Sequence, residues 1–361
     1  MRAIVDCTPL LVRSAGVKTY LHHLYVELRK QRGAAVRAYP PGVEPRDLDL
    51  ESSRTPLALL AHRAPSFITQ AVARGWMHGD LFHASNLVRN PPRRMRLTAT
   101  IHDLTCWILP ELHTPANVAA DQRLAGRVWS RADRLIAVSE SAKADAVRIL
   151  GFDPTRIEVI HHGVEERYFE DLTVSIERVR SHYGLAKPYV LSVGTIEPRK
   201  NISRLVEAWQ ALSAPLRDEF DLVTAGPPGW EQPEAMNRLR AGTRYLGYVP
   251  GADLPALTAG ATLFAYPSLY EGFGFPVAQA MACGVPVLTS AVSSLPEVAG
   301  DAAAFVDPKS STEIAGALGR LLTSPSERAR LAQAGRERAR RDYRWDRCAR
   351  QTWAFFERAC G

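Results

Sequence analysis

The residues best suited to chemistry are an acidic side chain, two glycines and a helix start in immediate succession. Glu271 precedes Gly272-Phe273-Gly274-Phe275, and Pro276 follows at the expected first helical position. Backbone N–H groups at a helix start favour an anion, and glycines let the backbone approach it closely. The run therefore predicts a phosphate-binding loop, with a diphosphate as its natural ligand.

A second candidate is the pair of adjacent cations Arg199 and Lys200. They belong to the segment Gly194-Thr195-Ile196-Glu197-Pro198-Arg199-Lys200-Asn201, which follows an expected strand. Ligands of open parallel sheets bind beyond the carboxyl ends of strands. Lysine acts as a point charge and arginine forks across two oxygens, so the pair suits a diphosphate leaving group. The alternative is a surface pair beside a helix N-terminus, where positive charge is mildly unfavourable.

Two further candidates lie in the first half of the chain. His102 ends the apolar run 97–101, where its alternatives are to bind a polar substrate, to carry a proton or to serve as a structural histidine. Gly16 lies in the loop 8–17 after the first expected strand and resembles a weakened phosphate loop. A single glycine in such a turn is commonplace, so this motif alone is unspecific.

The sequence predicts no metal site. His161 and His162 are adjacent in an extended segment, so they point to opposite faces and we expect a structural role for them. Asp47-Leu48-Asp49 has the form that holds a divalent cation on nucleotide diphosphates, but its polar, proline-flanked setting indicates solvated surface. The five cysteines are far apart and lack metal-ligand spacing, which favours a reduced, cytoplasmic setting.

The formal net charge is +7, with a local cluster at Arg89, Arg93, Arg94 and Arg96. This cluster is either solvated surface or a patch that contacts anionic lipid headgroups or an acidic acceptor, as a peripheral membrane contact of the N-terminal domain. Nucleic acid is not an expected partner, because no aromatic residues are interleaved with the charge. Neither a signal peptide nor a membrane span is expected, since no run of about 18 apolar residues occurs.

The length of 361 residues and the alternation of apolar runs with amphipathic segments predict two α/β domains with parallel sheets. Strands are expected at 3–7, 36–39, 81–84, 97–102, 134–138 and 157–160, then at 189–193, 221–224, 245–246, 262–265, 285–289 and 303–306. Helices are expected at 17–31, 141–150, 203–212, 253–259, 277–282, 312–322 and 327–341. Apolar residues recur at three- and four-residue steps from Trp345 to Cys360, which predicts a closing helix with one apolar stripe.

The order and spacing of these motifs resemble the retaining glycosyltransferases of family 4. The resemblance covers nearly the whole chain and is most specific around Arg199 and Glu271. Matching segments lie at 6–9, 101–104, 138–141, 194–201, 246–249, 267–286, 293–298 and 306–308. The resemblance implies the GT-B fold, with two Rossmann-like parallel-sheet domains facing across a cleft. These are an acceptor-side domain at 1–165, a linker at 166–188 and a nucleotide-sugar-binding domain at 189–343, with the helix 344–361 returning to the first domain.

The resemblance also implies a metal-independent, retaining hexosyltransferase of polysaccharide biosynthesis that requires no cofactor. Its donor would be a UDP- or GDP-linked sugar, and its acceptor a polysaccharide, a lipid-linked glycan or a small molecule. The segment 194–201 favours a sugar of mannose or rhamnose type. Glu271 would contact the transferred sugar, Arg199 and Lys200 would stabilise the leaving diphosphate, and His102 would bind sugar hydroxyls. The donor-binding residues implied are Gly16, Gly272, Phe273, Gly274, Phe275, Gln279, Tyr248 and Val249.

One residue departs from the family pattern. The family has a second glutamate eight positions after the first, which grips the ribose, whereas this chain has Gln279 there. An amide offers one acceptor oxygen and a donor in place of two acceptors, which lowers donor affinity by on the order of 1 to 3 kcal/mol if nothing compensates. The substitution leaves three alternatives: weaker ribose binding, a different donor pose, or a non-catalytic nucleotide-sugar-binding or partner-subunit protein. A nucleotide-sugar epimerase of the same fold is a further alternative.

Overall fold

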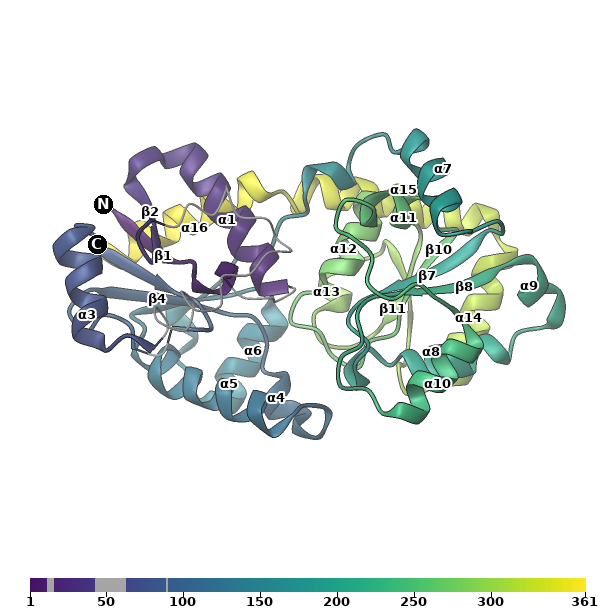
Figure 1. Ribbon diagram of the computed structural model, residues 1–361, viewed down its shortest axis with the longest axis horizontal. Coiled ribbons are helices and arrows are strands. Elements are labelled where there is room, and N and C mark those ends of the chain that lie inside the picture. Colours follow the sequence, from purple (N-terminus) through teal and green to yellow (C-terminus); the bar gives the residue numbers. More distant parts are fainter. Residues whose placement is uncertain (12–15, 43–62, 89) are drawn as a thin grey trace. The chain divides into compact units, whose positions relative to one another are not determined.

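The computed structural model describes residues 1–11, 16–42, 63–88 and 90–361. The chain divides into two compact units, and we describe each by itself (Figure 1). Unit 1 holds residues 1–163 and 344–361, and unit 2 holds residues 164–343. The segment 166–188, expected as a linker, contains η8(Glu166–Tyr168) and α7(Thr173–His182) and belongs to unit 2. Asp47, Asp49 and Arg89 lie outside the described residues.

Within the described residues, unit 1 contains a six-stranded parallel sheet in the order β2-β1-β3-β4-β5-β6. Its strands are β1(Ala3–Asp6), β2(Val36–Tyr39), β3(Leu81–Ala84), β4(Arg96–Ile101), β5(Arg134–Ala137) and β6(Ile157–Val159). Its longer helical elements are α1(Gly16–Arg32), α3(Ser66–Gln70), η4(Ala71–Trp76), α4(Thr105–Ile108), α5(Pro115–Arg127), α6(Glu140–Leu150) and α16(Trp345–Cys360). All six expected strands of this half are present, each with its ends within one residue of the prediction.

The closing helix α16 belongs to unit 1, where Figure 1 shows it beside α1. Its apolar stripe is buried, as amphipathic spacing predicts for a helix that covers a core. The chain passes this helix very closely at Gly163, because a Cβ there would lie 2.4 Å from the backbone nitrogen of Trp345. Any larger residue would clash with Trp345 there. Gly163 therefore lets α16 begin in close contact with the chain that ends the first part of unit 1.

Unit 2 contains a second six-stranded parallel sheet within the described residues, in the order β12-β11-β10-β7-β8-β9. Its strands are β7(Tyr189–Val193), β8(Asp221–Ala225), β9(Arg244–Tyr245), β10(Leu263–Tyr266), β11(Val287–Ser290) and β12(Ala303–Val306). Its remaining helices are α8(Ile202–Gln210), α9(Ala214–Glu219), α10(Pro233–Gly242), α11(Leu254–Ala259), α12(Phe275–Ala282), α13(Leu295–Ala299), α14(Ser311–Thr323) and α15(Pro325–Asp342). Both units are therefore α/β and Rossmann-like, as predicted.

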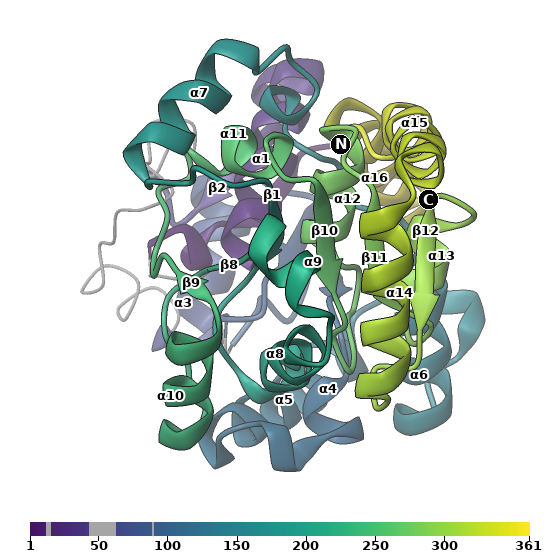
Figure 2. The same cartoon turned by 90° about the vertical axis from the view of Figure 1, so that its right-hand side faces the viewer.

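The core of unit 2 lies between its sheet and the helices α8, α10 and α14, which Figure 2 shows grouped together. Val190 and Leu263 from adjacent central strands pack with Leu205 of α8 and Leu318 of α14 in one buried cluster. Parallel strands with apolar residues throughout need helices on both faces. Because helices cover the faces of the sheet, polar side chains that act on a ligand are expected in the loops at the carboxyl ends of the strands.

Candidate active site

The strand order of unit 2 brings two candidate loops together. Strands β7 and β10 are hydrogen-bonded neighbours at the point where the order reverses, with β8 and β9 on one side and β11 and β12 on the other. The loop 194–201 follows β7 and the loop 267–274 follows β10. Ligands of open α/β sheets bind at such a switch point, beyond the carboxyl ends of the strands. The topology thus places Arg199 and Lys200 next to Glu271.

Four charged side chains from these loops form one buried ion quartet, which we define as Glu197, Arg199, Lys200 and Glu271. Arg199 Nη1 lies 2.9 Å from Glu271 Oε2, and its Nη2 lies 2.6 Å from Glu197 Oε1. Lys200 Nζ lies 2.7 Å from Glu271 Oε1. All four side chains are largely shielded from solvent, so these pairs are only weakly screened.

Glu271 is held as a carboxylate by donors on both of its oxygens. Besides Lys200, the Tyr266 hydroxyl donates to Oε1 over 2.9 Å and the Ser268 hydroxyl over 2.7 Å. Burial by itself raises the pKa of this carboxyl, but Arg199, Lys200 and the hydrogen bonds outweigh it and lower the pKa to about 2. Glu271 is therefore ionised at neutral pH and is unsuited to exchange protons with a substrate.

Lys200 keeps a donor that the protein does not use. Its ammonium carries three N–H groups, of which one donates to Glu271 and one to the Tyr266 hydroxyl over 2.6 Å. Burial and the neighbouring Arg199 lower the pKa of Lys200, and the two glutamates of the quartet oppose that shift. Within the described residues the third N–H has no partner, which leaves it for an anion.

The helix that follows Glu271, α12, begins at Phe275, one residue before Pro276, the expected first helical position. Gly274 precedes α12 with a φ of 94°, and a Cβ there would lie 2.8 Å from Leu295 Cδ2, so glycine is required. The Gly274 N–H makes no hydrogen bond to any described residue, whereas its carbonyl accepts from Val277 N over 3.0 Å. Phe273 is buried, with its ring centroid 5.4 Å from that of Tyr343. The loop is thus fixed by packing while an amide donor is left available.

The other predicted donor-binding residues of unit 2 lie on the same side of the sheet. Gln279 is partly buried on α12, and its side chain makes no hydrogen bond within the described part of the chain. Tyr248 is exposed and Val249 is buried, and both follow β9, two strands along the sheet from β7. Their place at the carboxyl edge is compatible with contact to one elongated ligand.

His102 and Gly16 lie in unit 1. His102 follows β4, and its ring centroid lies 4.9 Å from that of Tyr20 and 5.8 Å from that of His162. Burial lowers the pKa of His102 to about 4, although Asp103 opposes the shift. The imidazole is therefore neutral at pH 7. Gly16 is the exposed first residue of α1, and residues 12–15 before it lie outside the described part of the chain.

His162 is buried in an aromatic cluster, with its ring centroid 4.6 Å from that of Tyr20. Burial lowers its pKa well below the ordinary value, with His102 and His161 adding to the shift. This packing supports the structural role expected from its sequence position. Within the described residues, no three His, Cys, Asp or Glu side chains are arranged to hold a metal ion.

Sequence reasoning did not single out one member of the quartet, Glu197, or two hydroxyl donors beside it, Tyr266 and Ser268. Glu197 pairs with Arg199, and Tyr266 and Ser268 donate to Glu271. Glu197 stands inside the quoted segment 194–201, so a search for a counter-charge to Arg199 would have found it. Tyr266 ends an apolar strand, and its hydroxyl carries no signal in the sequence beyond the residue type.

Two family models match this chain, one over most of unit 2 and the other over most of unit 1. Residues 176–338 match the family described as Glycosyl transferases group 1, and residues 14–168 match Glycosyltransferase Family 4. The O-antigen chain mannosyltransferase B of Escherichia coli is 34% identical over 305 residues, which are 83% of this chain and 80% of that protein. The D-inositol 3-phosphate glycosyltransferase of Salinispora tropica is 34% identical over 280 residues, which are 67% of this chain and 57% of that protein.

Solved structures show the same fold. Anabaena HepE, solved in complex with UDP and glucose, matches with a TM-score of 0.72 at 18% identity and covers 99% of this chain and 100% of its own. The sucrose-phosphate synthase of Thermosynechococcus elongatus matches with a TM-score of 0.75 at 20% identity and covers 99% of each chain.

Proposed function

The chain is a glycosyltransferase that belongs to the glycosyl transferases group 1 family, and on this premise we propose that it transfers a hexosyl group from a nucleoside diphosphate with retention of configuration. The proposed donor is a UDP- or GDP-linked sugar of mannose or rhamnose type. The proposed acceptor is a polysaccharide, a lipid-linked glycan or a small molecule. Mannosyltransferases among its relatives and a UDP complex among its structural neighbours support this choice.

The quartet supplies the electrostatic part of the proposed reaction. As the bond between the sugar and the diphosphate breaks, negative charge grows on the departing phosphate oxygens. Lys200 meets that charge with its remaining N–H, and Arg199 offers a second cation from the same loop. The Phe273 and Gly274 N–H groups at the start of α12 complete the cradle. Donors fixed before the reaction need no reorganisation during it, which is why this kind of stabilisation is usually large.

Glu271 acts on the sugar side of the breaking bond in this proposal. The reacting carbon gains positive character as the diphosphate leaves, and a fixed carboxylate beside it stabilises that charge. A carboxylate with a pKa of about 2 remains charged throughout, so it neither gives nor takes the acceptor's proton. As the acceptor oxygen bonds to the sugar carbon, its proton passes to an oxygen of the departing diphosphate. The proposal needs no metal, since Arg199 and Lys200 take the place that a divalent cation holds on a diphosphate in other enzymes.

The remaining roles carry over from the family resemblance. Gln279 contacts the ribose, Tyr248 and Val249 contribute to the nucleotide pocket, and neutral His102 hydrogen-bonds the hydroxyls of the donor sugar. Gly16 lets the backbone of unit 1 approach the phosphates. Each of these assignments remains a proposal.

The observation that carries the proposal is the buried contact of both cations with Glu271 at the sheet's switch point. Arg199→Ala, Lys200→Ala and Glu271→Ala should each lower transfer by about tenfold or more, the usual effect of losing one charge-stabilising group. Arg217→Ala, which removes an exposed arginine from α9 in the same unit, is the matched control and should leave transfer unchanged. Turnover should be measured with a panel of UDP and GDP sugars, with circular dichroism as the check on folding.

Normal turnover in all three site variants would contradict the proposal. Donor binding without turnover in the wild type would indicate a binding protein, and isomerised donor would indicate an epimerase. These outcomes therefore separate the proposal from both alternatives.

A further inference from the structure

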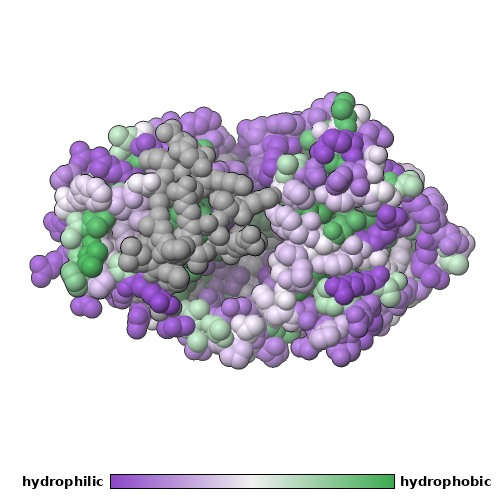
Figure 3. Space-filling view, viewed as in Figure 1, coloured by the Kyte–Doolittle hydropathy of each residue, from purple (hydrophilic) through white to green (hydrophobic). Residues whose placement is uncertain are grey.

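The short helical segment before β3 presents its large apolar side chains to solvent. In α3 and η4, Phe67 is 71% exposed and Trp76 is 68% exposed, while Thr69 and Ala73 are fully buried. Ile68 is also exposed. A surface helix of a soluble protein ordinarily buries its large apolar side chains and exposes its small polar ones. We call Phe67, Ile68 and Trp76 the α3 face, and Figure 3 shows exposed hydrophobic side chains where Figure 1 places α3.

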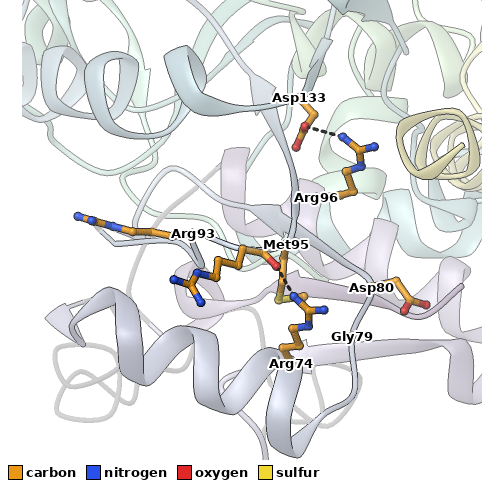
Figure 4. Close-up of a pocket in the computed structure, with 8 residues that line it drawn as sticks. Arg74, Gly79, Asp80, Arg93, Met95, Arg96 and Asp133 are labelled. Atoms are coloured by element: carbon orange, nitrogen blue, oxygen red, sulfur yellow. Dashed lines mark hydrogen bonds and ion pairs between the residues drawn. The ribbon is translucent and has the colours of Figure 1, made fainter.

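Beside this segment lies an arginine-lined pocket of about 400 Å³, to which η4 contributes Arg74 (Figure 4). It is lined by Arg74, Gly79, Asp80, Arg93, Arg94, Met95, Arg96 and Asp133, which we call the arginine pocket. Two hydrogen bonds tie it to the α3 segment. Gln70 Oε1 accepts from Arg94 N over 2.9 Å, and Arg74 Nη1 donates to the Arg94 carbonyl over 2.8 Å. The arginine pocket therefore lies directly beside the helical segment that carries the α3 face.

The charges of this pocket are not balanced internally. Asp133 pairs with Arg96 over 3.1 Å and accepts from Leu97 N over 2.7 Å. Asp80 accepts from Arg2 N over 2.7 Å. Both carboxylates are thus occupied, whereas the exposed Arg93 and Arg94 guanidinium groups have no carboxylate partner within the described residues. An anion that enters the pocket meets arginines with unused donors.

The surface lies away from the sheet edge where this fold binds its substrates. Asp80 precedes β3, Arg96 begins β4 and Asp133 precedes β5, so the pocket is at the amino edge of the sheet. His102, by contrast, follows the carboxyl end of β4. Because parallel strands separate these edges, substitutions in the arginine pocket should leave the chemistry at the carboxyl edges unchanged.

We propose that the α3 face and the arginine pocket form a docking surface for a bilayer that contains anionic phospholipid. Phe67, Ile68 and Trp76 enter the boundary between headgroups and acyl chains, where aromatic rings are favoured. Arg93 and Arg94 contact lipid phosphates, which a guanidinium binds through paired N–H groups. No described helix is long and apolar enough to span a bilayer, so the contact proposed is peripheral.

Sedimentation of the full chain with vesicles tests the proposal. Wild-type protein should sediment with vesicles that mix phosphatidylcholine and phosphatidylglycerol, much less with phosphatidylcholine alone, and less at high salt. Arg93→Ala/Arg94→Ala should lower the partition coefficient by about tenfold or more, because each cation near an anionic surface adds to binding. The matched control is Arg238→Ala/Arg240→Ala, which removes the same charge from exposed positions on α10 and should bind as the wild type does.

Insertion of the apolar side chains into the bilayer is tested separately from the contribution of the two arginines. Phospholipids with brominated acyl chains should quench part of the tryptophan fluorescence of the wild type, and Trp76→Phe should bind equally well but lose that quenching. Phe67→Ser/Trp76→Ser should weaken binding by about tenfold, whereas Val174→Ser, at an exposed apolar position of α7, should not.

Three results would overturn the docking surface: no sedimentation of the wild type with anionic vesicles, equal binding by Arg93→Ala/Arg94→Ala and the wild type, or quenching that persists in Trp76→Phe. Transfer to a water-soluble acceptor should remain at the wild-type rate in the Arg93→Ala/Arg94→Ala and Phe67→Ser/Trp76→Ser variants. Failure of the docking surface is therefore distinguishable from failure of the proposed function.

Discussion

The polar residues beyond the strand ends differ sharply between the two units. In unit 2, two cations and two carboxylates meet in a buried quartet, and Glu271 is held ionised with a pKa of about 2. In unit 1, His102 lies among Tyr20 and His162, and burial lowers the pKa of His102 to about 4, so that it is neutral at pH 7. The same sheet architecture thus supports a charged site in one unit and a neutral one in the other.

This contrast shows what burial does when counter-charges are present and when they are absent. Burial penalises the charged form of every titratable group. At Glu271 two cations and the Ser268 hydroxyl outweigh that penalty, whereas at His102 the single charged neighbour Asp103 does not. We therefore expect charge stabilisation from unit 2 and neutral hydrogen bonding from unit 1, and the following substitutions test that division.

The largest expected effect is on acid stability. Because the pKa of Glu271 is about 2 when folded and near 4.5 when unfolded, its ionisation stabilises the protein fully above pH 4.5 and progressively less as the pH falls toward 2. The contribution is on the order of 3 kcal/mol. Wild type should exceed Glu271→Gln in unfolding free energy most at pH 7, and the gap should narrow at pH 3. Urea unfolding at the two pH values measures it, and a constant gap would contradict the assigned ionisation.

Tyr266→Phe removes one donor from Glu271 Oε1 and the acceptor of one Lys200 N–H. A hydrogen bond to a charged group contributes about 1.5 to 3 kcal/mol, so transfer should fall by about tenfold or more. Phe264→Leu changes another buried aromatic residue of the same strand without touching the quartet and serves as the control. Steady-state kinetics that leave kcat/KM unchanged in Tyr266→Phe would mean that Glu271 does not depend on this hydroxyl.

The neutral state of His102 predicts a modest effect with a characteristic pH dependence. His102→Gln should lower kcat/KM by about fivefold, the value of one neutral hydrogen bond. The profile of kcat/KM between pH 5.5 and 8 should have the same shape in the variant and the wild type, because the pKa of His102 lies near 4. An acid limb near pH 6.5 that disappears in the variant would show that His102 titrates and would remove the contrast between the units.

Gln279→Glu is expected to have an effect no larger than that of His102→Gln, and a favourable one. If this position contacts the ribose, a carboxylate should bind both hydroxyls and tighten donor binding by about fivefold. Calorimetric titration of the variant with donor measures the change. Unchanged or weaker affinity would count against placing the ribose at α12.

The strands were predictable and several helices were not. The longer strands combine an apolar run with turn residues at their ends, whereas β9, the two-residue strand Arg244–Tyr245, has no apolar run of its own. By contrast, α7 buries only Val179 completely and α5 buries only Leu124 and Ala125, so neither shows a clear apolar period. Their helical state depends on neighbours that the sequence does not reveal.

The candidate site was likewise predictable from the sequence only in part. The phosphate-binding turn and the two cations are local motifs, so Arg199, Lys200 and Glu271 could be selected from the sequence. That these three touch depends on the adjacency of β7 and β10, which is a tertiary property. The contribution of Tyr266 depends partly on the same adjacency, because its hydroxyl accepts from Lys200 of the other loop, whereas Glu197 pairs with Arg199 within its own loop. Residue types in the sequence therefore indicate which side chains could act on a diphosphate, and the strand order brings those side chains into contact.

The most direct test of a diphosphate site at the quartet is isothermal titration of UDP, GDP and their parent nucleosides into the wild type, Arg199→Ala and Lys200→Ala. We predict that the wild type binds at least one nucleoside diphosphate, that each variant weakens this binding by about tenfold or more, and that affinity for the nucleoside is unchanged. Equal diphosphate affinity in the wild type and both variants would contradict the site.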